Sequence, residues 1–254
     1  MTRRRFYAPL SAFDSSLTRI TLAPEEARHL REVLRLKVGD EVYVFNGAGK
    51  EFQCRVEETR RDVAHLMVVR EVAAARPESP LHLTLAVALL KGEKFDLVIQ
   101  KATELGVTVI VPVVTKLADI RLRDDSDVVK RMTRWQRIAL EAAKQCGRAV
   151  VPDIAAPVAF ATFVQQTVAE PHSDCLLFSE RNGESLTETK RLLTPKTSRL
   201  TALVGSEGGW TDEEIMMAGD AGWRVITLGG RTLRAETAAI AAAVLLQHLA
   251  GDLT

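Results

Sequence analysis

Two arginines and a carboxylate lie close together near the C-terminus of the chain. Arg231 and Arg234 are three residues apart, and Glu236 follows them at the start of an alanine-rich stretch. Arginines on a loop can be solvated surface groups, but these lie between an apolar segment and a very apolar helix. Glu236 is at a helix N-terminus, where a carboxylate stabilises the helix in any case. The setting of the arginines nevertheless favours a ligand-binding site.

The elements around these residues repeat one pattern twice. Residues 200–204 and 225–228 are short apolar strands, each followed by a glycine-bearing loop, 205–210 and 229–234, and then by a helix start. Thr211 and Glu214 fit a capping box, which predicts that the first helix begins there. Glycines at such turns often only reverse the chain, but they also let the backbone approach a ligand. Two such loops on one parallel sheet should converge on one crevice.

Composition and charge set limits on the class of protein. The 254 residues are 46% hydrophobic and 26% charged, as in ordinary globular proteins. No apolar run approaches the roughly 20 residues that span a bilayer, and no secretory signal is visible. Three separated cysteines favour a reducing cytosol over a disulfide framework or a zinc site. We therefore expect a cytoplasmic protein without membrane segments or bound metal.

Basic residues gather in two regions although the net charge is only +1. Residues 1–37 hold eight Arg or Lys and four acidic residues, and residues 116–148 hold nine and five. Net charge alone argues against a nucleic-acid partner, but local basic patches can bind phosphates. Solvated helix faces also carry such residues, so the patches by themselves leave both interpretations open.

The chain divides into two predicted domains at a proline-bearing linker, residues 73–80. Residues 1–75 carry one short helix, 24–34, and strands at 40–45, 51–56 and 63–69, which is typical of a small β-barrel. From residue 81 onward strands alternate with helices, which predicts an α/β domain with a parallel sheet over residues 76–254. Its expected helices are 93–105, 127–146, 160–169 and 186–193, and its expected strands include 81–90, 107–114 and 175–178.

Missing motifs exclude several enzyme classes. The chain has no P-loop, no G-x-G-x-x-G after the first strand of the α/β region, no G-x-S-x-G and no H-E-x-x-H. What remains is a pocket of glycine loops with arginines and a separate basic β-rich module. That combination suits an enzyme that binds a small cofactor and a large anionic substrate.

The two loops, read with other segments, resemble a known family. Residues 203–209 (LVGSEGG) and 228–238 (LGGRTLRAETA) are similar to the SPOUT superfamily of RNA methyltransferases. Residues 5–7, 29–40, 101–106 and 141–148 also resemble its members that methylate N3 of a uridine in small-subunit (16S) ribosomal RNA. One departure is Ser206, where that family usually has proline.

The resemblance implies a fold and partners. It implies a PUA-like RNA-binding domain, followed by a SPOUT domain whose parallel sheet ends in a C-terminal trefoil knot. It also implies S-adenosyl-L-methionine as cofactor, a homodimer, and 16S ribosomal RNA or the assembled small subunit as substrate. The cofactor contacts that it implies are Leu203, Gly205, Glu207, Gly208, Gly209, Leu228, Gly229, Leu233, Thr237 and Ala238.

The same resemblance suggests roles in chemistry and in RNA binding. Uracil N3 carries a proton at neutral pH, so an arginine that stabilises the developing anion and a general base are needed. Arg234 is the first candidate for the arginine, with Arg231 second, and Glu236 or Glu207 for the base. The expected RNA contacts are Arg3, Arg4, Arg5, Arg31, Arg35, Gln145, Arg148 and Arg231. The alternatives are a SPOUT methyltransferase for another RNA position, and a non-catalytic RNA-binding protein with this fold.

Overall fold

A computed structural model describes residues 3–167, 173–188 and 198–253 of the chain. The chain forms two compact units. Residues 1–78 and 140–151 make the first, and residues 79–139 and 152–254 make the second. The division falls inside the long helix α3 (Asp125–Cys146), so that its last turns belong to the first unit. The continuous helical pattern of this segment gives no sign of that change.

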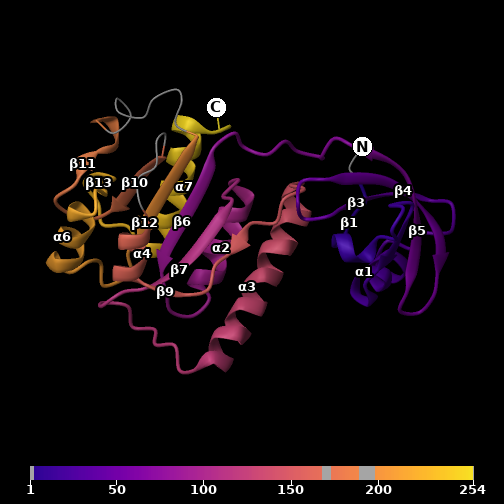
Figure 1. Ribbon diagram of the computed structural model, residues 1–254, viewed down its shortest axis with the longest axis horizontal. Coiled ribbons are helices and arrows are strands. Elements are labelled where there is room, and N and C mark those ends of the chain that lie inside the picture. Colours follow the sequence, from indigo (N-terminus) through magenta and orange to yellow (C-terminus); the bar gives the residue numbers. More distant parts are fainter. Residues whose placement is uncertain (1–2, 168–172, 189–197, 254) are drawn as a thin grey trace. The chain divides into compact units, whose positions relative to one another are not determined.

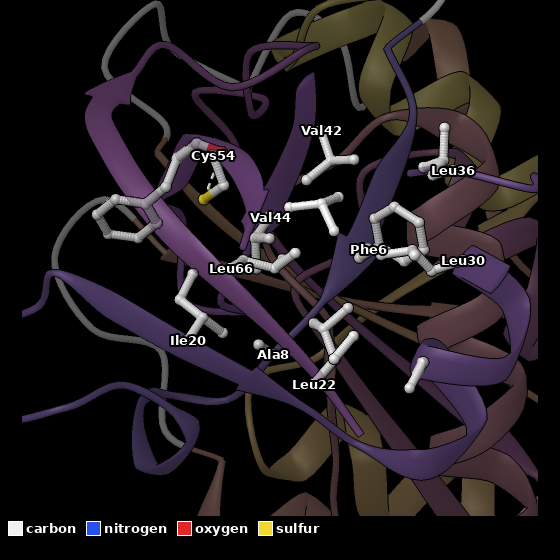
Figure 2. Close-up of a cluster of buried hydrophobic side chains, with 14 residues drawn as sticks. Phe6, Ala8, Ile20, Leu22, Leu30, Leu36, Val42, Val44, Cys54 and Leu66 are labelled. Atoms are coloured by element: carbon white, nitrogen blue, oxygen red, sulfur yellow. Dashed lines mark hydrogen bonds between the residues drawn. The ribbon is translucent and has the colours of Figure 1, made fainter. Parts of the chain in front are cut away.

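The first unit is built on one five-stranded sheet. Its strands follow the order β1-β3-β4-β5-β2, and only the β1–β3 pair is parallel. Their bounds are β1 (Arg5–Tyr7), β2 (Arg19–Leu22), β3 (Glu41–Phe45), β4 (Glu51–Thr59) and β5 (Ala64–Val72). One face of the sheet packs on a core that includes Phe6, Val42, Val44 and Leu66 (Figure 2). The alternation of buried and outward residues in these strands follows from the two-residue repeat of a strand.

The predicted helix at 24–34 has two parts. Pro24–Arg28 forms helix α1, with Pro24 in its first turn. His29–Val33 (η2) then winds more widely, because the N–H of Leu34 donates to the carbonyl of His29, five residues back. Such π-helical turns are rare, and hydrophobic periodicity does not distinguish them from an α-helix. A short 3-10 turn, η1 (Leu10–Ala12), precedes β2.

The second unit contains one parallel sheet. Its strand order is β11-β13-β10-β12-β6-β7-β8, and β9 also pairs with β7 (Figure 1). The bounds are β6 (His82–Ala88), β7 (Val109–Val114), β8 (Asp153–Ile154), β9 (Val158–Ala159), β10 (Ser173–Phe178), β11 (Glu184–Ser185), β12 (Arg199–Val204) and β13 (Arg224–Thr227). The pairs β6–β7 and β6–β12 are parallel, as the strand–helix–strand pattern predicts. The carboxyl-terminal halves of the central strands β6, β10 and β12 are apolar because both sheet faces are covered there.

Helices cover the two faces of this sheet (Figure 1). On one face α2 (Lys94–Glu104) packs against α7 (Ala235–Ala250), and α7 lies on β6 and β12. On the other face α4 (Phe160–Gln166) and α6 (Asp212–Asp220) enclose a core that includes Trp210 and Trp223. The α/β fold expected from the alternating elements is therefore confirmed.

Three expectations of the fold stay predictions in whole or in part. The helix expected at 186–193 and the end of the helix expected at 160–169 fall largely or partly on residues outside the described ones. The trefoil knot stays a prediction. The strand order shows one crossover in this region: β13 pairs with β10, although β12 comes between them in the sequence.

Candidate active site

A cavity of about 430 Å³ lies at the carboxyl ends of three neighbouring strands. Phe178 ends β10, Val204 ends β12 and Thr227 ends β13, and all three line the cavity. Because β10 lies between β12 and β13 in the sheet, the loops that leave these strands meet at one edge. Open parallel sheets bind ligands at this edge, and the volume is that of a typical small-molecule site.

The first wall of the cavity is the loop after β12, and its glycines are needed there. A side chain at Gly205 would lie 3.1 Å from the Trp210 ring, and one at Gly208 would lie 2.8 Å from the carbonyl oxygen of Leu117. Gly209 has φ +68°, a conformation that side chains disfavour. The indole of Trp210 anchors the loop by donating to the carbonyl of Phe178 over 2.8 Å.

Helix α6 begins directly after this loop, at the predicted capping box. The Thr211 hydroxyl accepts from the Glu214 N–H, and the Glu214 carboxylate accepts from the Thr211 N–H. The second oxygen of Glu214 accepts from the backbone N–H of Lys116. The predicted helix start is confirmed, and the same carboxylate ties the loop to a neighbouring segment.

The opposite wall is the loop after β13. Leu228, Gly229 and residues 231–235 line the cavity, and Arg234 is the residue immediately before helix α7. Gly229 has φ +107°, which only glycine adopts readily. Arg231 and Arg234 are both exposed and both face the same cavity. The two glycine loops therefore do share one crevice.

Most of the expected cofactor contacts lie around this cavity, and two do not. Leu203 is a fully buried core residue of β12, and Thr237 is an exposed residue of α7 outside the lining. Those that line it are Gly205, Glu207, Gly208, Gly209, Leu228, Gly229, Leu233 and Ala238.

Several lining residues were not anticipated from the sequence. Ser179 and Glu180 follow β10 directly, so the position of that strand beside β12 could have indicated them. Lys94 comes from the start of α2, far away in the chain. No sequence signal connects Lys94 with the glycine loops.

Lys94 links the first loop of the cavity electrostatically to the start of α7, where Glu236 lies outside the cavity lining. Its ammonium nitrogen lies 2.8 Å from Oε1 of Glu207 and 3.8 Å from Oε2 of Glu236. Burial raises the pKa of the Glu207 carboxyl, but the hydrogen bond and charge of Lys94, with backbone N–H groups, outweigh it and lower that pKa. Oε2 of Glu236 is inaccessible to solvent and accepts no hydrogen bond among the described residues.

In the first unit, three of the expected RNA-binding arginines are engaged by the protein itself. Arg5 donates to the Glu51 carboxylate and to the carbonyls of Ala143, Lys144 and Arg148 at the end of α3. Arg3 also pairs with Glu51, over 2.9 Å. The Arg148 side chain is only 5% exposed and pairs with Glu78. Arg5 and Arg148 are thus structural groups.

The other expected RNA contacts lie at the surface. Arg4, Arg35 and Gln145 are exposed. Arg31 is half-buried and donates to the carbonyl of Arg60 and to Glu32. Nothing in the sequence distinguishes these residues from Arg5 and Arg148. Their exposure in the structure distinguishes them.

Metal-ligand and membrane-spanning arrangements are both absent from the part of the chain that the structure describes. Among residues 3–167, 173–188 and 198–253, no group of three or more His, Cys, Asp or Glu side chains is placed to hold a metal ion. Within the same ranges no helix is both long enough and apolar enough to cross a bilayer.

Comparison with known proteins connects this architecture to a family. Residues 77–247 match the family described as RNA methyltransferase domain, and residues 22–65 match the RNA methyltransferase PUA domain. The ribosomal RNA small subunit methyltransferase E of Synechocystis sp. is 34% identical over 94% of this chain and 75% of the relative. The Bacillus subtilis protein of the same name is 29% identical over 86% of this chain and 85% of the relative.

A solved structure agrees over the whole chain. The ribosomal RNA small subunit methyltransferase E of Neisseria gonorrhoeae, bound to S-adenosyl methionine, superposes with a TM-score of 0.86 at 32% identity, and all of both chains is covered. These matches confirm the resemblance seen in the two glycine loops. The chain belongs to the family of RNA methyltransferases that includes ribosomal RNA small subunit methyltransferase E.

Proposed function

We propose that this protein methylates N3 of a uridine in the 16S RNA of the small ribosomal subunit, with S-adenosyl-L-methionine as methyl donor. The observation that carries the proposal is the cavity between the two glycine loops, with Arg234 and Arg231 on one wall. The relatives named ribosomal RNA small subunit methyltransferase E supply the class of substrate. The solved relative bound to S-adenosyl methionine supplies the cofactor.

The residues of the cavity fit this cofactor. Gly205, Gly208 and Gly209 line the cavity and carry no side chain, so their main-chain groups can approach an adenosine. Ser206 Oγ is buried without a hydrogen-bond partner among the described residues, as expected of a polar group at a ligand site. Leu228 and Leu233 supply apolar surface on the opposite wall.

The chemistry requires little of the protein beyond positioning. When bound, S-adenosyl-L-methionine supplies a methyl group that its sulfonium already activates. Uracil N3 becomes a nucleophile once it loses its proton, and we assign that proton to the carboxylate of Glu236. Arg234 stabilises the negative charge that then spreads onto the uracil oxygens. Because N3 is on the pairing edge, the uridine must be unpaired when it reaches Arg234.

The remaining assignments concern RNA and assembly. We assign residues 1–75 to RNA binding and residues 76–254 to catalysis. The RNA surface includes Arg4, Arg35 and Gln145, which are exposed. Arg231 approaches the RNA from the cavity wall. We also propose that the protein acts in the cytoplasm as a homodimer. The half-exposed Leu233 and Val244 offer apolar surface on the second loop and α7 for a second copy.

The experiment is methyl transfer from labelled S-adenosyl-L-methionine to small ribosomal subunits, followed by nucleoside digestion. We expect label in 3-methyluridine. Label in another nucleoside would replace the substrate, and no label with no cofactor binding by calorimetry would leave an RNA-binding protein. Arg234→Ala should abolish transfer while the cofactor affinity stays within about tenfold. Arg199→Ala is the matched control, because Arg199 begins β12 at the end away from the cavity and is exposed.

A further inference from the structure

Lys94 is the one lining residue of the cavity that α2 contributes. It makes ion pairs with two carboxylates: Glu207 of the first glycine loop, which lines the cavity, and Glu236 at the start of α7, which lies just behind the lining residues Arg234 and Ala235 in the sequence. Its side chain is about one third exposed, whereas that of Glu236 is only 13% exposed. This is not an isolated surface pair, because one cation serves two acids that the fold brings to it.

The surroundings of Glu236 make this cation important. Its Oε2 is closed to solvent and accepts no hydrogen bond among the described residues, so the Lys94 ammonium at 3.8 Å is the charge that compensates it. A buried carboxylate without such compensation is costly in its ionised form. If the ammonium is removed, Glu236 and Glu207 remain as two carboxylates of like charge, which disfavours ionisation of one of them.

Other charged groups at the cavity are placed differently. Glu180 follows β10, and Arg231 and Arg234 belong to the loop before α7. Those two arginines are exposed, and solvent screens their effect on Glu236. Lys94 instead is held by its hydrogen bond to Glu207. Glu207 therefore fixes the position of the Lys94 ammonium, and the positive charge of that ammonium acts on the Glu236 carboxylate.

We propose that Lys94 is a positioning residue for methyl transfer: it compensates the charge of the Glu236 carboxylate and holds that carboxylate in place, and Glu207 orients Lys94 for this task. The inference rests on the proposed function for its catalytic consequence, because it gives Glu236 the role of proton acceptor. Its electrostatic part, the coupling of Lys94 to Glu236, does not depend on that role.

The first test is the pH dependence of kcat for Lys94→Met. We expect the acid side of the profile to move upward by about one pH unit or more, so that kcat on that side falls about tenfold. The KM for S-adenosyl-L-methionine should change less than about threefold, and Lys94→Arg should restore most of the profile. Lys101→Met is the matched control, because Lys101 is on the same helix and pairs with Glu104.

The second test reads the coupling without catalysis. Protein labelled with ¹³C at glutamate carboxyls is titrated by NMR, and Glu236→Gln identifies the resonance of Glu236. Its midpoint should rise in Lys94→Met and stay in place in Lys101→Met. An unchanged midpoint, or a pH profile of Lys94→Met that superposes on the wild type, would overturn the inference. If the wild type makes no 3-methyluridine, the proposed function fails instead, while the titration still decides the coupling.

Discussion

Arg4 and Arg5 are adjacent in the sequence, and the structure predicts different effects for their replacement by alanine: a loss of stability for Arg5 and a change in RNA binding for Arg4. The Arg5 side chain is 7% exposed, pairs with the fully buried Glu51 over 3.1 Å, and lies 4.6 Å from the ring centre of Phe45. It also donates to three carbonyls near the end of α3, the shortest of these bonds being 2.8 Å, to Arg148. The Arg4 side chain is exposed.

The expected loss of stability follows from these contacts. Removing one partner of a buried ion pair costs about 3–5 kcal/mol. Glu51 would keep Arg3 and the N–H of Ala75 as partners, so we expect a value near the lower end, about 3 kcal/mol, for Arg5→Ala. Arg4→Ala should change the free energy of unfolding by less than about 0.5 kcal/mol, as is usual at the surface.

The assay must report on the first unit. All three tryptophans, Trp135, Trp210 and Trp223, belong to the second unit, so their fluorescence would miss the effect. Urea unfolding followed by far-UV circular dichroism, with hydrogen exchange of β3 and β4, gives the required signal. The free energies of the two variants are then compared with that of the wild type.

RNA binding provides the second half of the test. If Arg4 contacts one phosphate, Arg4→Ala should make the plot of log K against log salt shallower by about 0.7–0.9. Arg5→Ala, measured where it is folded, should leave that slope unchanged. A stability of Arg5→Ala within 1 kcal/mol of the wild type, together with a shallower slope, would refute our assignment of Arg5 as a structural group.

Two further predictions concern the cavity and the thiols. Gly208→Ala would bring a methyl group to 2.8 Å from the Leu117 carbonyl oxygen, so we expect calorimetry to show S-adenosyl-L-methionine binding about tenfold or more weaker, at a cost of about 1–3 kcal/mol. Gly230→Ala, with nothing within 4 Å, is the control, and equal affinities of the two variants would contradict the tight approach. Burial raises the pKa of Cys54 to about 12 and that of Cys175 to about 11. Ellman's reagent at pH 8 should therefore modify at most Cys146 in the native protein and all three cysteines after unfolding, and rapid reaction of all three in the native state would show that the two thiols are accessible.

The helices and strands of the second unit were predicted well because each is determined by residues that are close together in the sequence. The capping box of Thr211 and Glu214 involves residues three apart, and the apolar strands are continuous in the sequence. The rule that neighbouring parallel strands present their loops at one edge then brings 205–210 and 229–234 together. Structure was therefore predictable where the interacting residues are close in the sequence, or where a general rule for parallel sheets places the loops.

Contacts between distant residues were not predictable in the same way. Arg5 meets Ala143 across 138 positions and Lys94 meets Glu207 across 113. An arginine that closes a helix end and one that faces solvent have the same charge and hydropathy, so the basic N-terminal segment and the family resemblance assigned both Arg4 and Arg5 to RNA. The buried partner, Glu51, distinguishes them, and nothing near Glu51 in the sequence marks it as buried.

The proposed reaction explains why acids and bases are mixed in one cavity. A uridine anion and a sulfonium combine to neutral products, so charge disappears in the transition state, and a site of strong net charge would favour one reactant over the other. Arg234 and Lys94 have the same charge but act on different partners. Arg234 is proposed to stabilise the substrate anion, and its loss should then lower kcat across the pH range. Lys94 acts through Glu236, and its loss should move the profile along the pH axis. The shapes of the two profiles thus separate a group that contacts the substrate from one that prepares the base.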